Sequence, residues 1–280
     1  MKRIISILTL TALTIVTLAS CKTANSGSIS IVSREEGSGT RGAFIELFEI
    51  QEKDSAGKKV DKTSVNAEIT NSTSVMMTTI AGNKNAIGYI SLGSLNDTVK
   101  AVEIDGVKPS VENLKNKTYK ISRPFNIITK GTSSEISADF ISFILSKQGQ
   151  EVIEKEGYIS QNKGADYKGT GKSGEIKIAG SSSVTPVMEV LKESYNKLNP
   201  DVSIKIQQND SSTGITSTIE GICDIGMASR ELSQTEIAKG VSPQTIAMDG
   251  IAVILNKANT LNTLTSKQVK AIFTGEQTSF

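Results

Sequence analysis

The 280-residue sequence contains no histidine and no tryptophan, and its only cysteines are Cys21 and Cys223. Without histidine, Ser-His and Cys-His catalysis and the usual zinc ligand sets are excluded. Two cysteines do not make a disulfide framework, and Cys223, in the apolar stretch GICDIGMA, is expected to be a small buried side chain. The sequence also has no GxxxxGK[ST] motif and no GxSxG motif. It therefore indicates neither the phosphate-binding loop of nucleoside triphosphatases nor the nucleophile motif of hydrolases.

The first twenty residues have the pattern of a secretory signal peptide. Lys2 and Arg3 precede an apolar stretch, residues 4–18, that is short for a membrane span and right for a signal-peptide core. The stretch ends in LASC, which resembles the lipobox of bacterial lipoproteins. That resemblance implies acylation of Cys21, a polar tether over residues 21–28, and attachment to the outside of the cell membrane through lipid alone. The alternative is an ordinary signal peptide with an incidental cysteine.

The remaining chain is formally neutral. Removing residues 1–20 takes away Lys2 and Arg3, which leaves 29 basic residues against 29 acidic ones. Bulk charge therefore predicts no nucleic-acid partner and no charged membrane-surface partner. Any anion must be bound by a local site.

Strand and helix patterns alternate after residue 28, which predicts α/β sheets of the parallel type. Strands are expected at 28–33, 86–92, 99–107, 121–130, 175–180, 202–207, 223–228 and 245–256, and helices at 41–50, 74–83, 109–116 and 265–275. Residues 134–158 are expected to form one long helix or two joined near Gly149, and residues 181–200 and 211–221 are each expected to form a loop followed by a helix. Pro124 lies within one of these strands, which favours an edge or crossing strand. Residues 51–63 are expected to be a loop or surface insertion. Residues 159–174, with four glycines and several lysines, are the strongest linker candidate.

Three loops rich in Gly, Ser and Thr each follow an expected strand and open an expected helix: EGSGTR at 36–41, GSSSVTP at 180–186 and DSSTG at 210–214. A helix N-terminus offers unpaired N–H groups and a positive dipole end, so such loops suit an anion. The alternative is that each is a plain helix cap. Arg34 beside the first loop is expected to bind an oxyanion with Glu36 bracing its guanidinium, whereas Arg41 is expected to form a surface ion pair with Glu35 or Glu36.

Seven segments together resemble the phosphate-binding lipoproteins of bacterial ABC phosphate importers: IVSREEGSGTRGAF, NAIGYISLG, ISRPFNIITKG, IAGSSSVTPVMEVL, DSSTGI, DIGMASREL and AMDGIAVILN. The resemblance implies a two-lobed α/β periplasmic-binding-protein (Venus-flytrap) fold, with two α/β domains joined by crossing hinge strands. It also implies capture of inorganic phosphate for ABC transporter permease subunits, with no cofactor and no enzymatic activity. The segment like AGSSSVTP comes first in that family and second here, so the order indicates a circular permutation. One lobe is then expected over 29–124 plus 251–280, and the other over 125–250, including the linker 159–174.

Matching the family motif residue by residue implies a phosphate site made of Arg34, Ser38, Gly39 and Thr40 from one lobe and Ser182, Ser183 and Ser211 from the other. Ser229 falls where several relatives place a ligand contact and some have an aspartate. Asp249 is therefore the candidate acceptor for the proton that phosphate carries and sulfate lacks, and its alternative is a turn aspartate. Asp224 is expected to be structural, and Arg230 to pair with Glu231.

Other functions stay open at this point. A different tetrahedral oxyanion, such as sulfate or molybdate, would use the same kind of loop. A surface adhesin or sensor could keep the fold without transport. A hydrolase with a Ser or Ser-Lys nucleophile is the remaining alternative. A monomer is expected, although a permuted chain could exchange segments between two copies.

Overall fold

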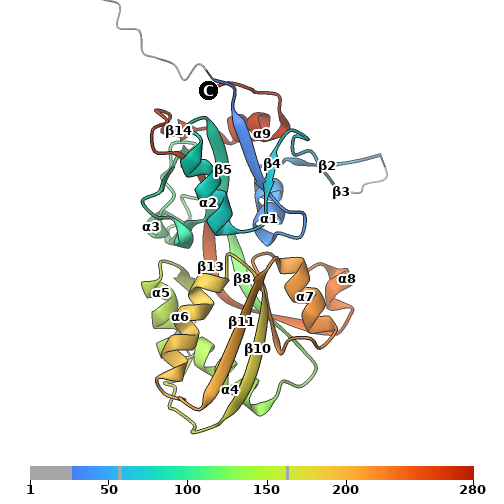
Figure 1. Cartoon of the computed structure of the whole chain (residues 1–280), viewed down its shortest axis with the longest axis vertical. Helices are drawn as coiled ribbons and strands as arrows, with labels where there is room; N and C mark the ends of the chain where they lie inside the picture. Colours follow the sequence, from blue (N-terminus) through green and yellow to red (C-terminus); the bar gives the residue numbers. More distant parts are fainter. Residues whose placement is uncertain (1–26, 56–58, 162–163) are drawn as a thin grey trace, which may run out of the picture.

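The computed structural model describes residues 27–55, 59–161 and 164–280. The expected signal peptide, Cys21 and most of the tether therefore lie outside the described residues. Two lobes lie one above the other in Figure 1, and long strands run between them. We call them the upper lobe, which holds both ends of the described chain, and the lower lobe. Within the described ranges, no helix has both the length and the apolar character to cross a membrane.

The upper lobe contains elements from both ends of the chain. They are β1 (Ser30–Arg34), α1 (Gly39–Leu47), β2 (Gln51–Lys53), β3 (Lys59–Asp61), β4 (Glu68–Thr70), α2 (Thr73–Gly82), β5 (Ala86–Ser91), η1 (Leu92–Ser94), β6 (Val99–Ala101), β7 (Glu103–Ile104), α3 (Val111–Lys115), β14 (Thr263–Leu264) and α9 (Ser266–Thr274). In the stretch 51–63, expected as a loop or surface insertion, strands β2 and β3 pair antiparallel. Helix α9 begins after the Thr265 cap and ends at Gly275 with φ 85°, as the sequence predicts.

The lower lobe is formed by the middle of the chain. Its elements are α4 (Glu135–Leu145), α5 (Lys147–Lys155), β9 (Ile159–Ser160), β10 (Gly174–Ser181), α6 (Thr185–Asn196), β11 (Val202–Asn209), α7 (Ser211–Ile219), β12 (Ile225–Ala228) and α8 (Gln234–Ile237). Of the two alternatives for residues 134–158, the structure shows two helices, which meet at Ser146 instead of near Gly149, and the Ser146 side chain caps α5. Cys223 is buried, as expected, although it precedes β12 instead of lying within it.

Two crossing strands, β8 (Ser122–Lys130) and β13 (Val241–Asn256), join the lobes into one sheet with the order β11-β10-β12-β8-β13-β5-β1-β4. Strand β10 pairs parallel with β11 and β12 in the lower lobe, and β1 pairs parallel with β4 and β5 in the upper lobe, whereas β13 runs antiparallel to β8 along its first part and to β5 along its last. Strand β8 is thus a central crossing strand, and the edge alternative is wrong. Pro124 is tolerated there because β12 pairs only with residues 126–128 of β8.

Each lobe has its own apolar core. The lower core takes its buried residues from 125–247, and the upper cores take theirs from 29–121 and 251–273. The two described chain ends meet in the upper lobe, where the Ile29 amide donates to the Thr278 carbonyl at 2.8 Å. These cores are those expected of two hinged units, and the boundaries 29–124 plus 251–280 and 125–250 stay our prediction.

The segment expected as a linker, 159–174, packs onto the lower lobe wherever it is described. Tyr167 is buried against Phe143, and its hydroxyl donates to Asp139 at 2.6 Å. The Gly164 amide donates to the Leu145 carbonyl at 3.0 Å. A low apolar content therefore did not make these residues an open tether, because one aromatic side chain and its hydrogen bonds attach them to the core.

Candidate functional site

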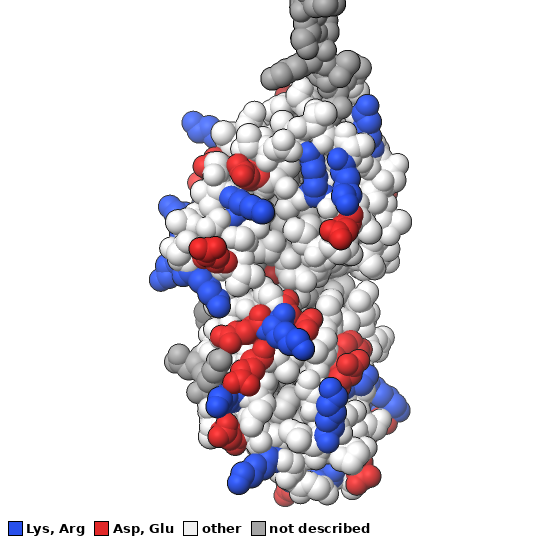
Figure 2. All heavy atoms as spheres, turned by 90° about the vertical axis from the view of Figure 1, so that its left-hand side faces the viewer, with Lys and Arg blue, Asp and Glu red and all other residues white. Residues whose placement is uncertain are grey.

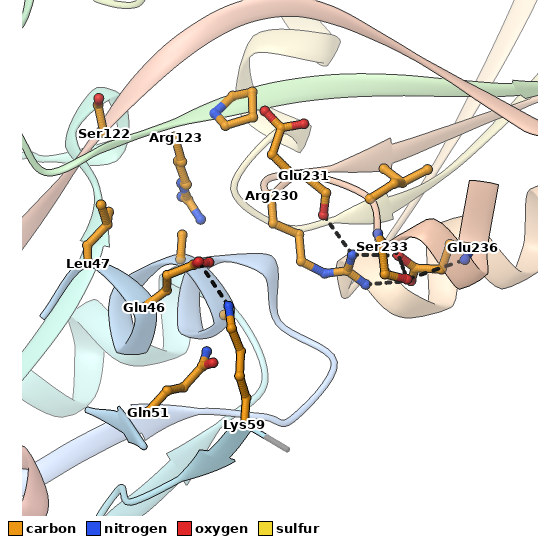
Figure 3. A pocket seen from close by; sticks show the side chains of 14 residues that line it. Glu46, Leu47, Gln51, Lys59, Ser122, Arg123, Arg230, Glu231, Ser233 and Glu236 are labelled. Atoms are coloured by element: carbon orange, nitrogen blue, oxygen red, sulfur yellow. Dashed lines mark hydrogen bonds and ion pairs between the residues drawn. The ribbon is translucent and has the colours of Figure 1, made fainter. Parts of the chain in front are cut away.

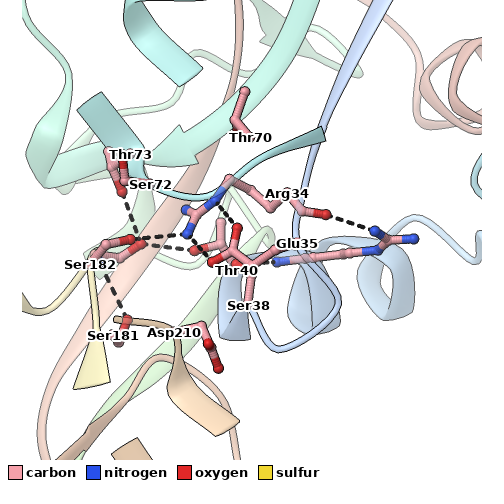
Figure 4. A network of polar contacts seen from close by, with 12 residues as sticks. Arg34, Glu35, Ser38, Thr40, Thr70, Ser72, Thr73, Ser181, Ser182 and Asp210 are labelled. Carbon is pink, nitrogen blue, oxygen red and sulfur yellow. Dashed lines mark hydrogen bonds and ion pairs between the residues drawn. The ribbon is translucent and has the colours of Figure 1, made fainter. Parts of the chain in front are cut away.

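The predicted anion loops meet between the lobes (Figure 4). Ser38 caps α1, and its side chain accepts from the Arg41 amide. Asp210 caps α7 in the same way by accepting from the Thr213 amide. The third loop, residues 181–184, leads into α6. Two of the loops are therefore side-chain helix caps, whereas α6 has Val184 at its N-cap with no side-chain hydrogen bond. The fold also brings all three helix starts to one place, so capping and anion binding are compatible.

Arg34, at the end of β1, is 2 % exposed and contacts both lobes. Its Nη2 donates to Ser182 Oγ of the lower lobe at 3.0 Å. Its Nε and Nη2 also donate to the two carboxylate oxygens of Glu35 at 2.8 and 2.7 Å. The expectation that Glu36 braces Arg34 is therefore wrong. Glu35 carries the pairing carboxylate, and Glu36 is exposed on the turn.

The remaining nitrogen of Arg34 is unused. Among the described residues, Nη1 of Arg34 has no hydrogen-bond partner, whereas Nε and Nη2 do. The two hydrogen bonds to Glu35 fix the orientation of the guanidinium, and the N–H groups of Nη1 remain available to donate to an anion. Arg41 pairs with Asp61 at 2.9 Å and with neither predicted glutamate, and its Nη1 donates to the Arg34 carbonyl at 2.7 Å.

Hydroxyl groups bond across the lobes beside Arg34. Thr40 Oγ1 of α1 and Ser183 Oγ lie 2.8 Å apart, and both residues are about 1 % exposed. Thr73 Oγ1, at the start of α2, lies 3.4 Å from the same Ser183 oxygen. Sequence reasoning missed Thr73. The signal was available, because NSTS at 71–74 is another hydroxyl-rich start of a helix after a strand.

Ser211 and Ser229 form a second hydroxyl pair in the lower lobe, and both are fully buried. The Ser229 amide donates to Ser211 Oγ at 3.1 Å, and Ser181 Oγ donates to Ser229 Oγ at 3.0 Å. The hydroxyls of Ser211 and Ser229 lie directly against the first residue of α1, which belongs to the other lobe.

Gly39 makes this close approach possible. A Cβ on Gly39 would lie 2.4 Å from Ser211 Oγ and 2.7 Å from Ser229 Oγ. A Cβ on Gly37 would lie 2.2 Å from Asp210 Oδ1. Gly37, Gly39 and Gly42 also have the GxGxxG spacing. Here the first two glycines admit the opposite lobe where a side chain would stand.

Asp249 is placed away from the loops. It lies within β13, so it is not a turn aspartate, and its carboxylate forms a buried ion pair with Arg123 at 3.2 Å. Its Oδ1 accepts from Ser91 Oγ at 2.9 Å. Burial raises the pKa of Asp249 to about 6 although Arg123 and Ser91 act in the opposite direction. The carboxylate reaches the loops only through Arg123, so its expected role as direct acceptor for the ligand is not supported.

Sequence reasoning missed Arg123 on β8. Its Nη1 donates to the Ser229 carbonyl at 3.2 Å and to Ser229 Oγ at 3.1 Å. An arginine within the otherwise apolar strand ISRPFNII was the available signal, because a buried charge requires partners. Of the remaining aspartates, Asp224 accepts from the Lys177 amide at 2.7 Å, which agrees with a structural role.

A groove of about 560 Å³ lies beside the loops, between α1, β8 and α8 (Figure 3). Arg230 at its wall pairs with Glu236 at 2.8 Å, and the predicted pairing with Glu231 is wrong because Glu231 offers only its carbonyl, at 3.0 Å. Burial alone would raise the pKa of Glu236, but Arg230 and the Ser233 amide together hold it at about 2. Since Glu46 likewise pairs with Lys59, the charged groups of this groove already neutralise one another.

Charge elsewhere is mixed. On the face shown in Figure 2, basic and acidic side chains are interspersed over both lobes. Among the residues that the structure describes, no group of three or more His, Cys, Asp and Glu side chains is placed to hold a metal ion. The site therefore presents buried N–H and O–H donors around the Arg34 guanidinium, and such a set of donors suits a small oxyanion.

Comparisons with known proteins agree with this geometry. A family model described as "PBP superfamily domain" matches residues 11–148 and 165–279. "Phosphate-binding protein PstS 2" of Streptococcus agalactiae serotype V is 59% identical over 268 residues, 94% of this chain and 92% of the relative. "Phosphate-binding protein PstS 2" of Streptococcus pneumoniae serotype 4 is 45% identical over 263 residues, 94% of this chain and 90% of that relative.

A solved structure agrees as well. The crystal structure of a phosphate-binding protein of a phosphate ABC transporter from Streptococcus pneumoniae TIGR4 has a TM-score of 0.70 and 46% identity, covering 90% of this chain and 98% of that one. Since these similarities extend along nearly the whole chain, the segment order is shared with these streptococcal proteins. The chain therefore belongs to the PBP superfamily and, within it, to the PstS family of phosphate-binding proteins.

Proposed function

We propose that this chain captures inorganic phosphate between its two lobes and presents it to the permease of an ABC importer. The observation that carries the proposal is the contact between Arg34 and Ser182, which joins a buried guanidinium of the upper lobe to a helix-start loop of the lower lobe. The names of the streptococcal relatives support phosphate as the ligand and import as the process.

The hydrogen-bond donors around Arg34 can replace the water molecules that hydrate an anion in solution. Burying a multiply charged anion without partners is prohibitive, so its hydration must be replaced by many hydrogen bonds. The proposed ligand set keeps most of the sequence prediction and adds one residue: Arg34, Ser38, Gly39, Thr40, Thr73, Ser182, Ser183, Ser211 and Ser229. These residues are presented by the starts of α1, α2, α6 and α7, whose N–H groups add donors and positive dipole ends.

Closure of the lobes would complete this set. The upper-lobe donors and the lower-lobe donors meet only when the lobes approach each other, and β8 and β13 are the strands that cross between them. An anion that binds both lobes favours the closed arrangement by its differential affinity. Arg34 and Thr40 would then bind it from above and Ser182 and Ser183 from below.

Another tetrahedral oxyanion, sulfate, is the second candidate. It is favoured by the serine at 229, where the family resemblance implies an aspartate in some members, together with the Asp249 carboxylate facing Arg123. A site with few hydrogen-bond acceptors discriminates less between phosphate, which carries a proton, and sulfate, which carries none. No catalytic role is proposed for this chain, because the transport proteins it resembles bind and release their ligand.

Several further features complete the proposal. The chain acts outside the cytoplasm as a monomer, held at the membrane by lipid on Cys21. Its segment order is permuted relative to family members that begin with a segment like AGSSSVTP. Support for the permutation comes from the adjacent chain ends, where Ser28 and Ser279 form a β-bridge, and from the packed segment 164–174 that connects the two halves.

Calorimetry tests the proposed function. Protein purified without its signal peptide and stripped of phosphate should bind phosphate with one site per chain, and a tenfold excess of sulfate should displace little of it. Heat of binding with sulfate but none with phosphate would favour the second candidate. Binding of neither anion would contradict the proposal and favour a protein that has kept the fold without transport.

A further inference from the structure

Arg123 is a second buried guanidinium beside the proposed site, and neither the sequence motif nor the family comparison assigns it a role. It is 2 % exposed, on the crossing strand β8. Its Nε and Nη2 donate to Asp249 Oδ2 at 3.4 and 3.2 Å. Its Nη1 donates to Ser229 at the carbonyl and at Oγ. The fork thus connects the hinge carboxylate on one side to the proposed ligand residue Ser229 on the other.

Asp249, on the crossing strand β13, holds the fork in place. Its second oxygen accepts from Ser91 Oγ at 2.9 Å and from the Gly93 amide at 3.4 Å. The guanidinium also lies over the Phe125 ring, with its carbon 5.4 Å from the ring centre. A planar group with all three nitrogens committed and an aromatic face beside it has one orientation.

The hydrogen bonds at Ser229 decide what its hydroxyl can do. A hydroxyl oxygen has two lone pairs and one proton. Both lone pairs of Ser229 Oγ are occupied, because Arg123 Nη1 donates at 3.1 Å and Ser181 Oγ donates at 3.0 Å. Ser181 Oγ in turn accepts from the Ser183 amide at 3.3 Å. The remaining proton of Ser229 meets Ser211 Oγ only at 3.4 Å, which is longer than an ordinary O–H···O bond, so it remains available to a ligand.

We propose that Arg123 is a positioning residue of the anion site, which fixes the Ser229 hydroxyl as a hydrogen-bond donor toward the bound anion. This inference rests on the proposed function. The same hydroxyl faces the start of α1, since a Cβ on Gly39 would lie 2.7 Å from it. We expect an anion bound to the N–H groups at the start of α1 to accept a hydrogen bond from the Ser229 hydroxyl. Arg123 acts through Ser229 and through no contact of its own with the ligand.

A double-mutant cycle tests this role with phosphate as the probe. Ser229→Ala removes one hydrogen bond to a charged ligand and should weaken phosphate binding about 10- to 100-fold. Arg123→Gln combined with Asp249→Asn removes the buried pair as a whole, so that no unpaired charge stays buried, and should weaken binding by a similar factor. When all three changes are combined, the loss should stay within about 3-fold of either alone, because both act through one hydroxyl.

Arg123→Lys is the matched variant that keeps the charge and the Asp249 partner but lacks the fork. It should lose phosphate affinity nearly as much as Ser229→Ala, and little more when combined with it. This second cycle replaces the first if the charge-free variant does not fold, as judged by its melting temperature.

Each outcome decides between roles. Losses that multiply in the combined variants, or wild-type affinity in Arg123→Lys, would overturn the positioning role. Wild-type protein that binds no phosphate at all would contradict the proposed function instead, so the two failures are distinguishable.

Discussion

The close approach of the two lobes at Gly39 predicts that one added methyl group will weaken ligand capture. Gly39→Ala places a Cβ at 2.4 Å from Ser211 Oγ and 2.7 Å from Ser229 Oγ, both on the opposite lobe. It also places the Cβ 3.0 Å from the Ser229 carbonyl carbon, so backbone is involved and a side-chain rotation alone does not relieve the contact.

The magnitude follows from the cost of overpacking, which is about 1–3 kcal/mol for an added methylene in a packed interior. This cost falls on the closed arrangement alone, because the clashing atoms belong to different lobes. Phosphate affinity should therefore fall by roughly 5- to 150-fold. The separate lobes should not be destabilised, since alanine has a helix propensity about 1 kcal/mol better than glycine and α1 contains the substituted position.

Gly42→Ala is the control in the same helix. The Cβ at position 42 would have only Arg230 Cδ as a neighbour, at 3.6 Å, which is ordinary contact. Calorimetry gives the affinities, small-angle X-ray scattering gives the radius of gyration with and without saturating phosphate, and thermal unfolding checks the fold. Gly42→Ala should behave as wild type, whereas Gly39→Ala should stay extended at phosphate concentrations that compact the wild type. Equal affinity of the two variants would refute the reasoning.

Further substitutions test the charges and the packed segment. Arg34→Ala should lose about 2–5 kcal/mol of phosphate binding free energy in calorimetry, and Arg41→Ala about 1 kcal/mol or less; similar losses would remove Arg34 from the site. Because burial raises the pKa of Asp249 from 3.8 to about 6, only the folded chain keeps its proton between these values. The contribution of this proton to the free energy of unfolding is fully present below pH 3.8, and about 3 kcal/mol of it is lost as pH rises through 6. Urea unfolding of Asp249→Asn at pH 4.5 and 6.5 should lack that decline, and an unchanged decline would contradict the assignment. Tyr167→Phe removes the hydroxyl that donates to Asp139, and should lower the free energy of unfolding by about 1 kcal/mol; no change would mean that the segment is held by the ring alone.

The local structure was readable from the sequence because its causes are local. Strands β1, β5 and β10 and helices α1, α2 and α7 occupy the expected stretches, since apolar periodicity and hydroxyl caps act within a few residues. Helix α8 is only four residues long, which is too short for a helical periodicity to be recognised in the sequence. The two crossing strands were visible as apolar runs, although their central place in one continuous sheet was not.

The partners of the charged groups were predicted poorly, and the reason is also physical. Glu35 and Glu36 are adjacent and chemically similar, so only the direction of the turn after β1 decides which one reaches Arg34. Arg230 pairs with Glu236 and not with its neighbour Glu231, because Glu236 starts a helical turn that folds back beside it. Sequence proximity says little about which carboxylate a flexible guanidinium meets.

The sequence by itself determined the elements, the hydroxyl- and glycine-rich helix starts and the choice of Arg34, because residue type and short-range spacing specify caps and periodicity. Only the tertiary structure decided that Thr73 joins these loops, that Asp249 faces Arg123, and that Arg123 donates to Ser229. These pairings join residues more than 100 positions apart, and they depend on how two lobes pack across a shared sheet, which no local pattern encodes.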